Sequence, residues 1–436
     1  VTIQAQILKL MKYLQGELQM AVLMITHDLG VVANVADEVV VMYHGKLMES
    51  GTVEDIFRKA EHPYLKSLLR AVPRFNMGPG ERLVPIREIK AETGTLLDQG
   101  KVPPTAPGAD PTVLKVDHVS KTFIIRKAGL FGDKAAGSLC AVDDVSFTVK
   151  RGECLGLVGE SGCGKTTLSK IILRAIEADS GDITFNAHGT EIDIRKLSTG
   201  QLIPFRRKIQ FIFQDPFGSL NPRMTVYDIV AEPLIIHKIG DKQERREFVQ
   251  ELMRLVGLDP RYLRRYPHSF SGGQRQRIGI ARALALRPEM IICDEPVSAL
   301  DVSIQAQVLN LLKDLQEKLG LTYLFISHNL AVVDYIAQRI AVMCAGRLVE
   351  IAPREELFHN PIHPYTQALV SAVPEPNLEN KLDLSALMEG KASNPAAWPA
   401  PFTIDGSATL GLVEFEPGHF VRADPAKAQG ITAAAS

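Results

Sequence analysis

The chain has 436 residues, of which 46% are hydrophobic and 23% are charged, and its formal net charge is −1. This length suggests two to three domains with full cores. The balanced charge argues against a nucleic-acid-binding surface. The sequence contains no apolar run of about eighteen residues, so it predicts no membrane span. The five cysteines form no C-x₂-C pair, which argues against a zinc site or a disulfide framework and favours a reducing compartment.

The N-terminal segment, residues 1–73, repeats a later part of the chain. It aligns without gaps on residues 302–374, and about 32 of the 73 positions are identical, a similarity far above chance. The second copy has about 190 further residues upstream within its own domain. We therefore expect residues 1–73 to be the C-terminal remnant of a first domain. A natural one-and-a-half-domain protein is the alternative, but it would leave strand edges and an apolar face exposed.

Composition divides the rest of the chain into three parts. Residues 74–112 are broken by proline and glycine and carry mixed charge, which indicates a linker. Residues 113–374 are predicted to form one complete α/β domain. Residues 375–436 form a C-terminal tail with one strand-like run, Leu410 to Phe415, and no recognisable chemistry.

A phosphate-binding loop with the pattern G-x-x-x-x-G-K-[ST] lies in the complete domain. It follows an apolar strand, residues 154–158, and precedes an apolar helix, which is the context that the motif requires. Its glycines allow backbone N–H groups to surround phosphate oxygens, Lys165 supplies a charge between the β- and γ-phosphates, and the Thr166 hydroxyl is placed to bind Mg²⁺. A glycine-rich turn with a surface lysine is the weaker alternative. The predicted phosphate-contacting residues are Gly159, Glu160, Ser161, Gly162, Cys163, Gly164, Lys165, Thr166 and Thr167.

Further polar motifs follow in chain order. A strand ends at Gln214, and Ser271-Gly272-Gly273-Gln274 opens an amphipathic helix. A buried strand ends in Asp294-Glu295, Ser298 to Asp301 follow it, and another apolar strand ends in His328.

Together with the phosphate loop, these motifs resemble the nucleotide-binding domain of ABC transporters. The resemblance implies an α/β P-loop NTPase fold with a RecA-like core, an antiparallel β subdomain and a helical subdomain, preceded here by a partial second copy. It also implies an ATPase that converts ATP and water to ADP and phosphate, with Mg²⁺ bound to the ATP.

The resemblance assigns roles to the residues at the strand ends. Thr166, Gln214 and Asp294 would bind Mg²⁺, directly or through water. Glu295 would act as the general base for the attacking water. His328 would contact the γ-phosphate, and Gln214 would sense it. The structural alternatives are a strand-end salt bridge for the two carboxylates, a solvated glutamine and a structural histidine.

The resemblance also implies that ATP joins two domains. Ser271, Gly272, Gly273 and Gln274 form the signature, whose helix N-terminus would face the ATP bound by the opposite domain. A plain helix cap is the alternative. Asp301 would belong to the loop called the D-loop, and His27 would be the switch histidine of the remnant domain.

Two further residues have less specific signals. Phe123 resembles the aromatic residue that stacks on adenine, with a core phenylalanine as the alternative. We also hypothesise that Cys163 makes the ATPase sensitive to alkylation and that ATP protects it; an inert packing role is the alternative.

The segment from His363 to Pro374 resembles the C-terminal signature of oligopeptide, dipeptide and nickel importer ATPases, and the same pattern stands at His62 to Pro73. A helix bracketed by prolines is the structural alternative. Two copies resemble the fused tandem ATPases of bacterial peptide importers. Many relatives continue with a cysteine-rich segment that binds an iron–sulfur cluster in some of them, but residues 74–112 and 375–436 contain no cysteine, so no cluster is expected.

The resulting hypothesis is an ATP-hydrolysing subunit that energises import of di- or oligopeptides, or of a related solute such as glutathione or nickel. Its expected partners are two membrane permease subunits, a second nucleotide-binding domain and, indirectly, a solute-binding protein, with no nucleic acid. We expect it at the cytoplasmic face of the plasma membrane.

Two alternatives come from other classes of protein. A soluble ABC ATPase acting on the ribosome or DNA is disfavoured for two reasons. Ser271 follows Gln214 by only 57 positions, which leaves no room for a long coiled coil, and residues 74–112 are not basic. A non-catalytic interaction module is disfavoured because Glu295 and His328 are both present.

Overall fold

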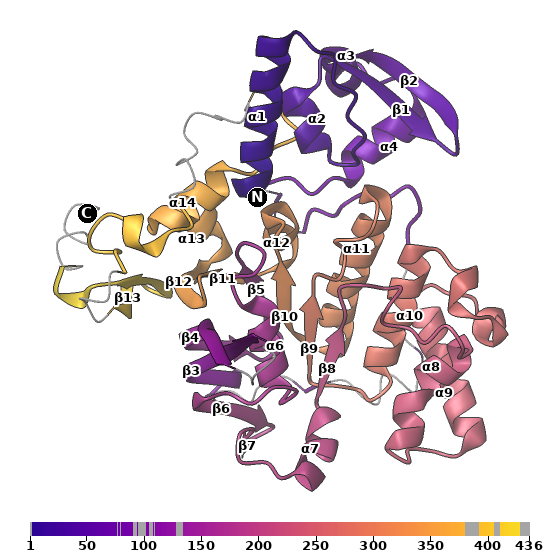
Figure 1. The fold of residues 1–436 in the computed structure, drawn as a ribbon. Helices are drawn as coiled ribbons and strands as arrows, with labels where there is room; N and C mark the ends of the chain where they lie inside the picture. The colour runs from indigo at the N-terminus through magenta and orange to yellow at the C-terminus, as the bar shows by residue number, and fades with distance from the viewer. Residues whose placement is uncertain are drawn as a thin grey trace.

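The computed structural model describes residues 2–75, 77–78, 80–89, 94, 102–103, 108, 110–127, 134–379, 392–404 and 410–427. Figure 1 shows the segment of residues 2–75 above a larger body built around a mixed sheet. Among the described residues, no helix has both the length and the hydrophobicity needed to cross a lipid bilayer.

The central sheet has the strand order β13-β14-β12-β11-β5-β10-β9-β8. Strands β8, β9, β10, β5 and β11 run parallel to one another, whereas β12, β14 and β13 are antiparallel to their neighbours. All residues of β5, β9 and β10 are buried, as expected for parallel strands that helices cover on both faces. The strands and their main helices are β5 (Cys154–Val158), α6 (Lys165–Ile172), β8 (Ile209–Ile212), α10 (Gly272–Leu284), β9 (Met290–Asp294), α11 (Val302–Leu319), β10 (Thr322–Ser327), α12 (Leu330–Ile336), β11 (Arg339–Cys344), β12 (Arg347–Pro353), α13 (Arg354–His359) and α14 (Pro364–Ser371).

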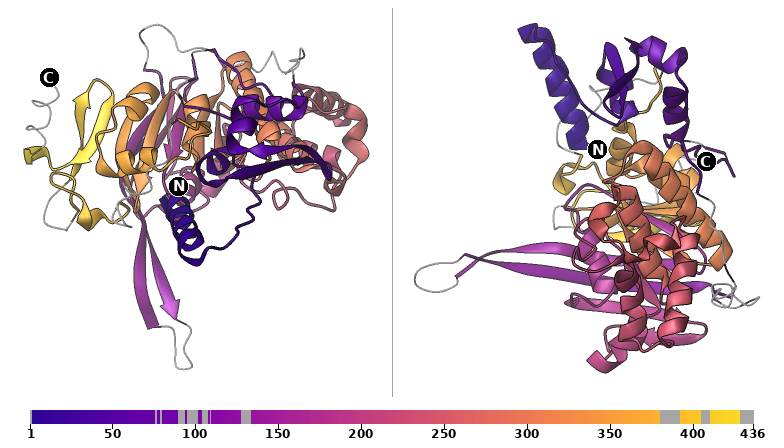
Figure 2. Two further views of the ribbon diagram at one scale, coloured as in Figure 1. Left: turned by 90° about the horizontal axis from the view of Figure 1, so that it is seen from above. Right: turned by 90° about the vertical axis from the view of Figure 1, so that its right-hand side faces the viewer.

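A second, antiparallel sheet has the order β4-β3-β6-β7. It comprises β3 (Thr112–Lys127), β4 (Lys134–Lys150), β6 (Ser180–Ala187) and β7 (Thr190–Asp193), and α7 (Thr199–Arg206) follows it. Figure 2 shows the hairpin of β3 and β4 extending well beyond the body of the molecule.

A small helical region lies between β8 and α10. It contains α8 (Val226–Ile236), α9 (Lys242–Leu255) and the 3₁₀ turns η1 (Pro260–Arg264) and η2 (Pro267–Ser269). Capping boxes at Thr225 and Asp241 define where α8 and α9 begin. With 14 residues, α9 is the longer helix, so this region, all of which the structure describes, contains no long coiled coil. The parallel core, the antiparallel sheet and the helical region are the three parts that the resemblance implied.

The N-terminal segment has the same order of helices and the same hairpin pairing as the C-terminal part of the complete domain. In the first hairpin Glu38 pairs with Thr52, and at the aligned positions of the second hairpin Arg339 pairs with Pro353. Both hairpins also shift register at the equivalent place. The matching elements are α1 (Thr2–Leu18), α2 (Leu29–Val35), β1 (Glu38–Tyr43), β2 (Lys46–Thr52), α3 (Val53–Arg58) and α4 (Pro63–Ala71).

One strand of the repeat has no counterpart in this segment. Residues 21–26 align on β10 but form no strand. In the complete domain β10 pairs with β5 and β9, and the described part of the chain contains one copy of those two strands. Leu23 and Ile25 are accordingly 91% and 93% exposed, whereas their equivalents Leu324 and Ile326 are fully buried.

The described part of the predicted linker packs against α11. Arg82 Nη1 lies 2.6 Å from Asp314 Oδ1, Asn310 Nδ2 donates to Leu83 O at 2.9 Å, and Val102 N donates to Leu319 O at 2.9 Å. These residues of the linker are therefore attached to the complete domain.

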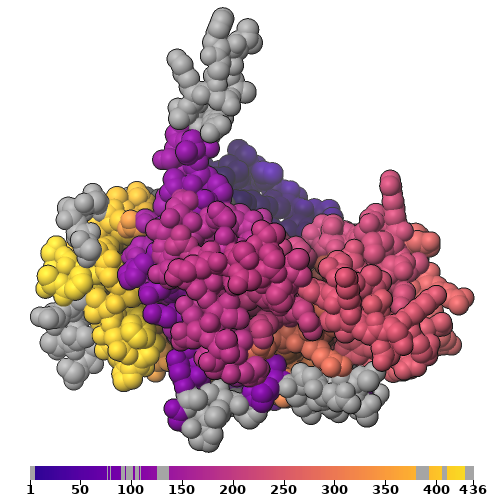
Figure 3. Space-filling view, turned by 90° about the horizontal axis from the view of Figure 1, so that it is seen from below, coloured from indigo at the N-terminus to yellow at the C-terminus, as the bar shows by residue number. Residues whose placement is uncertain are grey.

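The tail adds two strands to the central sheet. The predicted strand-like run at Leu410 to Phe415 is largely β13 (Gly411–Glu416), which pairs with β14 (His419–Ala423), and β14 pairs with β12. Arg422, almost fully buried, donates to Leu348 O at 2.8 Å and reaches Asp144 Oδ2 at 3.1 Å. Figure 3 shows the tail, in yellow, lying beside the purple strands β3 and β4.

Candidate functional site

The predicted phosphate loop is a tight turn between β5 and α6. Gly159 and Gly164 have φ values of +149° and +108°, a region that side chains rarely adopt. A Cβ at Gly159 would lie 2.1 Å from Met343 O, and one at Gly164 would lie 2.1 Å from Ala141 O. Both positions therefore require glycine on steric grounds.

Lys165 lies inside this loop and is only 5% exposed. Its ammonium donates to Gly159 O at 2.7 Å and to Glu160 O at 2.8 Å. Lys165 also begins α6, so the ammonium and the helix N-terminus concentrate positive potential at one place. This arrangement favours an anion such as a phosphate group.

Thr166 and Asp294, two of the predicted Mg²⁺ ligands, are neighbours. Thr166 Oγ1 lies 3.4 Å from Asp294 Oδ1, although the two residues stand far apart in the chain. Burial raises the pKa of Asp294, and the Thr166 hydroxyl partly offsets that rise.

The three predicted catalytic side chains meet at Glu295. Gln214 Nε2 donates to Glu295 Oε2 at 2.8 Å, and His328 Nδ1 lies 2.9 Å from Glu295 Oε1. Burial by itself raises the pKa of Glu295. The hydrogen bond and charge of His328 lower it, and Lys165 and Ser298 add to that effect. The lowering is larger, so the pKa of Glu295 lies below its usual value. The carboxylate is therefore ionised at neutral pH and is available as a hydrogen-bond acceptor.

The backbone at Glu295 is also unusual. Its φ is +47°, a left-handed conformation that costs a non-glycine residue on the order of 1–3 kcal/mol. Its N–H donates to Ile326 O at 2.9 Å. This bond to β10 holds the residue in that conformation.

The predicted signature does not meet the phosphate loop of its own domain. Ser271 caps α10 in a capping box with Gln274, and α10 packs against β8. Three strand spacings separate β8 from β5 in the sheet, which is about 14 Å. The geometry is thus compatible with the predicted action on another domain's nucleotide.

Phe123 lies on β3 opposite Leu139 and is 36% exposed. Lys121 Nζ is 5.7 Å from the centre of its ring. Ala141, two residues beyond Leu139, approaches Gly164 of the phosphate loop. Phe123 is therefore near the loop and is not a core residue, but its adenine role remains a prediction.

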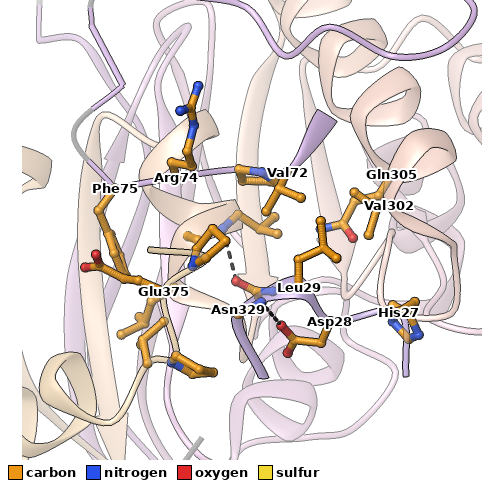
Figure 4. Close-up of a pocket in the computed structure, with 18 of the residues that line it drawn as sticks. His27, Asp28, Leu29, Val72, Arg74, Phe75, Val302, Gln305, Asn329 and Glu375 are labelled. Carbon is orange, nitrogen blue, oxygen red and sulfur yellow. Dashed lines mark hydrogen bonds between the residues drawn. The ribbon is translucent and has the colours of Figure 1, made fainter. Parts of the chain in front are cut away.

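A cleft of about 640 Å³ lies between the N-terminal segment and the complete domain. Figure 4 shows His27 and Asp28 from the first segment, and Gln305 and Asn329 from the complete domain, lining it. Ser298 and His328 also line this cleft. The predicted switch histidine His27 thus lines the cleft from the N-terminal segment, and His328 lines it from the complete domain. Asp301, the predicted D-loop residue, caps α11.

Maleimide is expected to modify Cys140 well before Cys163. Cys140 is exposed, whereas Cys163 is buried in the phosphate loop. Burial raises the pKa of the Cys163 thiol, which lowers its reactive thiolate fraction. The structure thus favours the inert interpretation of Cys163 over the alkylation hypothesis. Mass spectrometry of the labelled peptides over time tests this; equal labelling rates for the two cysteines would contradict it.

The structure brings two residues to the phosphate loop that the sequence analysis did not assign. Tyr365 Oη accepts the Glu160 N–H at 3.1 Å, and Ser393 Oγ donates to Glu160 Oε2 at 2.5 Å. The repeated His-Pro-Tyr pattern could have drawn attention to Tyr365. Nothing in the sequence marks Ser393.

Comparison with protein families gives two matches. The model described as "ABC transporter" matches residues 142–298. The model described as "Oligopeptide/dipeptide transporter, C-terminal region" matches twice, at residues 48–101 and 349–400. The second model therefore covers both copies of the His-Pro-Tyr pattern.

Curated relatives are similar over most of the chain. The glutathione import ATP-binding protein GsiA of Pectobacterium atrosepticum is 45% identical over 98% of this chain and 67% of its own length. GsiA of Escherichia coli K12 is 50% identical over 86% of this chain and 59% of its own length. The chain thus spans about three fifths to two thirds of the relatives it matches.

Solved structures of ATP-binding cassettes are also similar. A dimeric cassette in a post-hydrolysis state with ADP and Pi is 31% identical, and the match covers 55% of this chain and 98% of that one with a TM-score of 0.48. The cassette cbiO1 from Clostridium perfringens is 25% identical, and the match covers 58% of this chain and 92% of that one, again with a TM-score of 0.48.

The family assignment follows from the sequence matches. Their matched residues include the phosphate loop, the signature, the Asp294–Glu295 pair and both His-Pro-Tyr copies. The chain therefore belongs to the ABC transporter ATP-binding proteins, in the branch that carries the oligopeptide/dipeptide transporter C-terminal region.

Proposed function

We propose that the chain is an ATP-hydrolysing subunit of a bacterial importer for glutathione or for other small peptides. The observation that carries the ATPase part is the meeting of Gln214 and His328 on one ionised carboxylate, Glu295. This cluster stands at the carboxyl ends of parallel strands, where open α/β sheets bind their ligands.

In this proposal the phosphate loop binds the nucleotide. Lys165 and the N–H groups at the start of α6 contact the β- and γ-phosphates. Thr166 and Asp294 would hold Mg²⁺, which neutralises phosphate charge during transfer. Their hydroxyl and carboxylate oxygens, already 3.4 Å apart, are the hard ligands that Mg²⁺ prefers.

Glu295 would act as the base for the attacking water. A nearby carboxylate in its ionised form can accept a proton as the water attacks the γ-phosphorus. The hydrogen bonds from Gln214 and His328 fix the orientation of this carboxylate. Both residues would also orient the water and the γ-phosphate.

The complete catalytic site would include the signature of a second domain. Ser271 to Gln274 lie at a helix N-terminus that is exposed or half-buried except at Gly273. We propose that this helix start binds the γ-phosphate of ATP held by another cassette. Residues 1–73 would be the C-terminal part of that other cassette, which the equivalent pairing of the β1–β2 and β11–β12 hairpins supports.

The permease contact would lie beside Gln214. Phe213 and Phe217 flank it and are both exposed, and Arg282 and Arg275 lie over their rings. Exposed aromatic side chains beside arginine are enriched in protein interfaces. Binding of permease loops here would place the chain at the cytoplasmic face of the plasma membrane.

The solute is proposed from the relatives, whose names describe glutathione import. The test is ATP hydrolysis by the chain assembled with its permeases and solute-binding protein in proteoliposomes. Glutathione is expected to stimulate hydrolysis more than a dipeptide, an oligopeptide or nickel. Preferential stimulation by the dipeptide, the oligopeptide or nickel would contradict glutathione as the solute, and no ATP hydrolysis at all would contradict the ATPase proposal.

A further inference from the structure

Glu160, the second residue of the phosphate loop, is held by two parts of the chain outside the loop. Its backbone N–H donates to the Tyr365 hydroxyl at 3.1 Å. Its carboxylate Oε2 accepts from Ser393 Oγ at 2.5 Å. Tyr365 belongs to α14 and Ser393 to the tail, so helix and tail converge on one loop residue.

Tyr365 is rigidly placed. It is fully buried, and its own N–H donates to His363 Nδ1 at 3.1 Å, which caps α14. The N–H of His363 in turn donates to Glu350 Oε2 at 3.1 Å. Since Glu350 lies on β12 of the central sheet, the Tyr365 hydroxyl has a defined position relative to the strands that carry the loop.

The tail is docked on the same helix through Trp398. Its ring lies 4.6 Å from the ring of His363 and 6.3 Å from that of Tyr365, measured between centroids, and it is 3% exposed. The indole N–H donates to Ala392 O at 2.6 Å. Because Ala392 directly precedes Ser393, this bond fixes the backbone next to the hydroxyl that binds Glu160.

A second attachment joins the tail to the carboxylate of Glu350. His419 Nε2 on β14 lies 2.7 Å from Glu350 Oε1, and both side chains are fully buried. Glu350 therefore connects β14 of the tail with the cap of α14. Helix, tail and the N-terminal half of the phosphate loop form one hydrogen-bonded unit.

The Glu160 carboxylate needs such an anchor. Its second oxygen, Oε1, is buried and has no hydrogen-bond partner among the residues that the structure describes, and the group carries the same sign of charge as a nucleotide phosphate. A carboxylate free to turn towards the phosphates would weaken anion binding. The Ser393 hydroxyl fixes one oxygen and so restricts the directions that the other can take.

We propose that Tyr365 and Ser393 are positioning residues for the phosphate loop, through which the docked tail raises the affinity for nucleotide. This inference rests on the proposed ATP binding at the loop. Neither residue touches the reacting atoms. Their effect is on the conformation of Glu160 and on the loop around it.

The test measures equilibrium binding of a non-hydrolysable ATP analogue and the steady-state rate in the full chain. Tyr365→Phe and Ser393→Ala each remove a hydrogen bond to Glu160 and are expected to raise the Kd by about three- to tenfold. The rate at saturating ATP is expected to change by less than about twofold. Unchanged melting temperatures would show that the variants are folded.

Matched controls come from the repeat and from the same helix. Tyr64, the equivalent of Tyr365 in the first copy, stacks on Tyr43, and Ser371 Oγ donates within its own helix, to Ala368 O. Tyr64→Phe and Ser371→Ala should leave the Kd unchanged. Equal Kd shifts in controls and test variants would overturn the positioning role.

A double-mutant cycle isolates the tail contact. In a Glu160→Ala background Ser393 has lost its acceptor, so Ser393→Ala should then change the Kd by less than about twofold. If the parent chain binds the analogue and Tyr365→Phe and Ser393→Ala bind it equally well, the inference is wrong. If the parent chain itself does not bind the analogue, the proposed ATP binding fails instead.

Discussion

Replacing Glu295 with glutamine is expected to lower ATP hydrolysis by about 10²–10⁴-fold while leaving ATP binding intact. Glutamine has the same shape but cannot accept the proton of the attacking water. The two partners of the carboxylate, Gln214 and His328, remain in place to hold the side chain. The phosphate loop and the Thr166–Asp294 pair are untouched, so the nucleotide should still bind.

The same variant should accumulate as an ATP-bound dimer. If hydrolysis releases two domains that ATP holds together, blocking it traps the joined state, which size-exclusion chromatography with light scattering detects. Glu177→Gln is a matched control, because Glu177 is exposed and pairs with Arg174 on the protein surface. A Glu295→Gln chain that hydrolyses ATP at the parent rate would show that Glu295 is not the base.

Two inactive variants are expected to restore activity when they are mixed. Lys165→Ala removes the buried ammonium of the phosphate loop, and Gly272→Glu puts a negative charge where the signature would meet a γ-phosphate. If two chains form a symmetric dimer, a homodimer of either variant has no working site, whereas a dimer of one Lys165→Ala chain and one Gly272→Glu chain keeps one working site. An equal mixture should therefore recover up to about a quarter of the parent rate.

The structure indicates why Gly272 is the position to change. A Cβ at Gly272 would meet Leu300 and Phe217 at 3.6 and 3.8 Å, which is ordinary contact. A Cβ at the neighbouring Gly273 would lie 2.0 Å from Ile304 Cγ2 and would disturb α11. A carboxylate at a helix N-terminus also stabilises the helix, so the lost activity of Gly272→Glu would not come from unfolding.

The measurement is the ATPase rate of each variant alone and of the mixture, at several protein concentrations. Specific activity of the parent chain should fall on dilution below the micromolar range if a second copy of the chain supplies the signature. Mixtures that stay inactive while both variants remain folded would argue against a signature acting on another chain. A constant specific activity on dilution would do the same.

Much of the site was readable from local sequence. The phosphate loop needs glycine where φ is positive, a lysine and a hydroxyl residue within one short stretch, so its chemistry is local in the chain. Asp294 and Glu295 could be identified because they end a wholly apolar strand. Their roles came from resemblance to a family, and those roles remain proposals.

The contacts between motifs were not readable from the sequence. Gln214 and His328 stand far from Glu295 along the chain, and no local pattern states that they bind the two oxygens of one carboxylate. They meet because β8, β9 and β10 are parallel neighbours in the sheet. Parallel strands present their carboxyl ends at one edge, so residues from distant segments gather there.

The position of the C-terminal tail was even less predictable from the sequence than these contacts. Its strand-like run at Leu410 to Phe415 was predicted, because alternating apolar residues are a local signal. Its position was not, because the partner of β14 is β12 and the hydroxyl of Ser393 meets Glu160, which lies in a distant part of the chain. A single serine in a polar stretch has no pattern that predicts its partner.

The sequence by itself therefore indicated an α/β domain, the phosphate-loop motif and the repeat of residues 1–73 at 302–374, because local patterns and similarity between segments can be read along the chain. The division of the domain into a core, an antiparallel sheet and a helical region came from the resemblance to a family. Only the tertiary structure showed that Gln214 and His328 both contact Glu295, and that Tyr365 and Ser393 contact Glu160. Such contacts depend on strand order and long-range pairing, which follow from the packing of the whole chain.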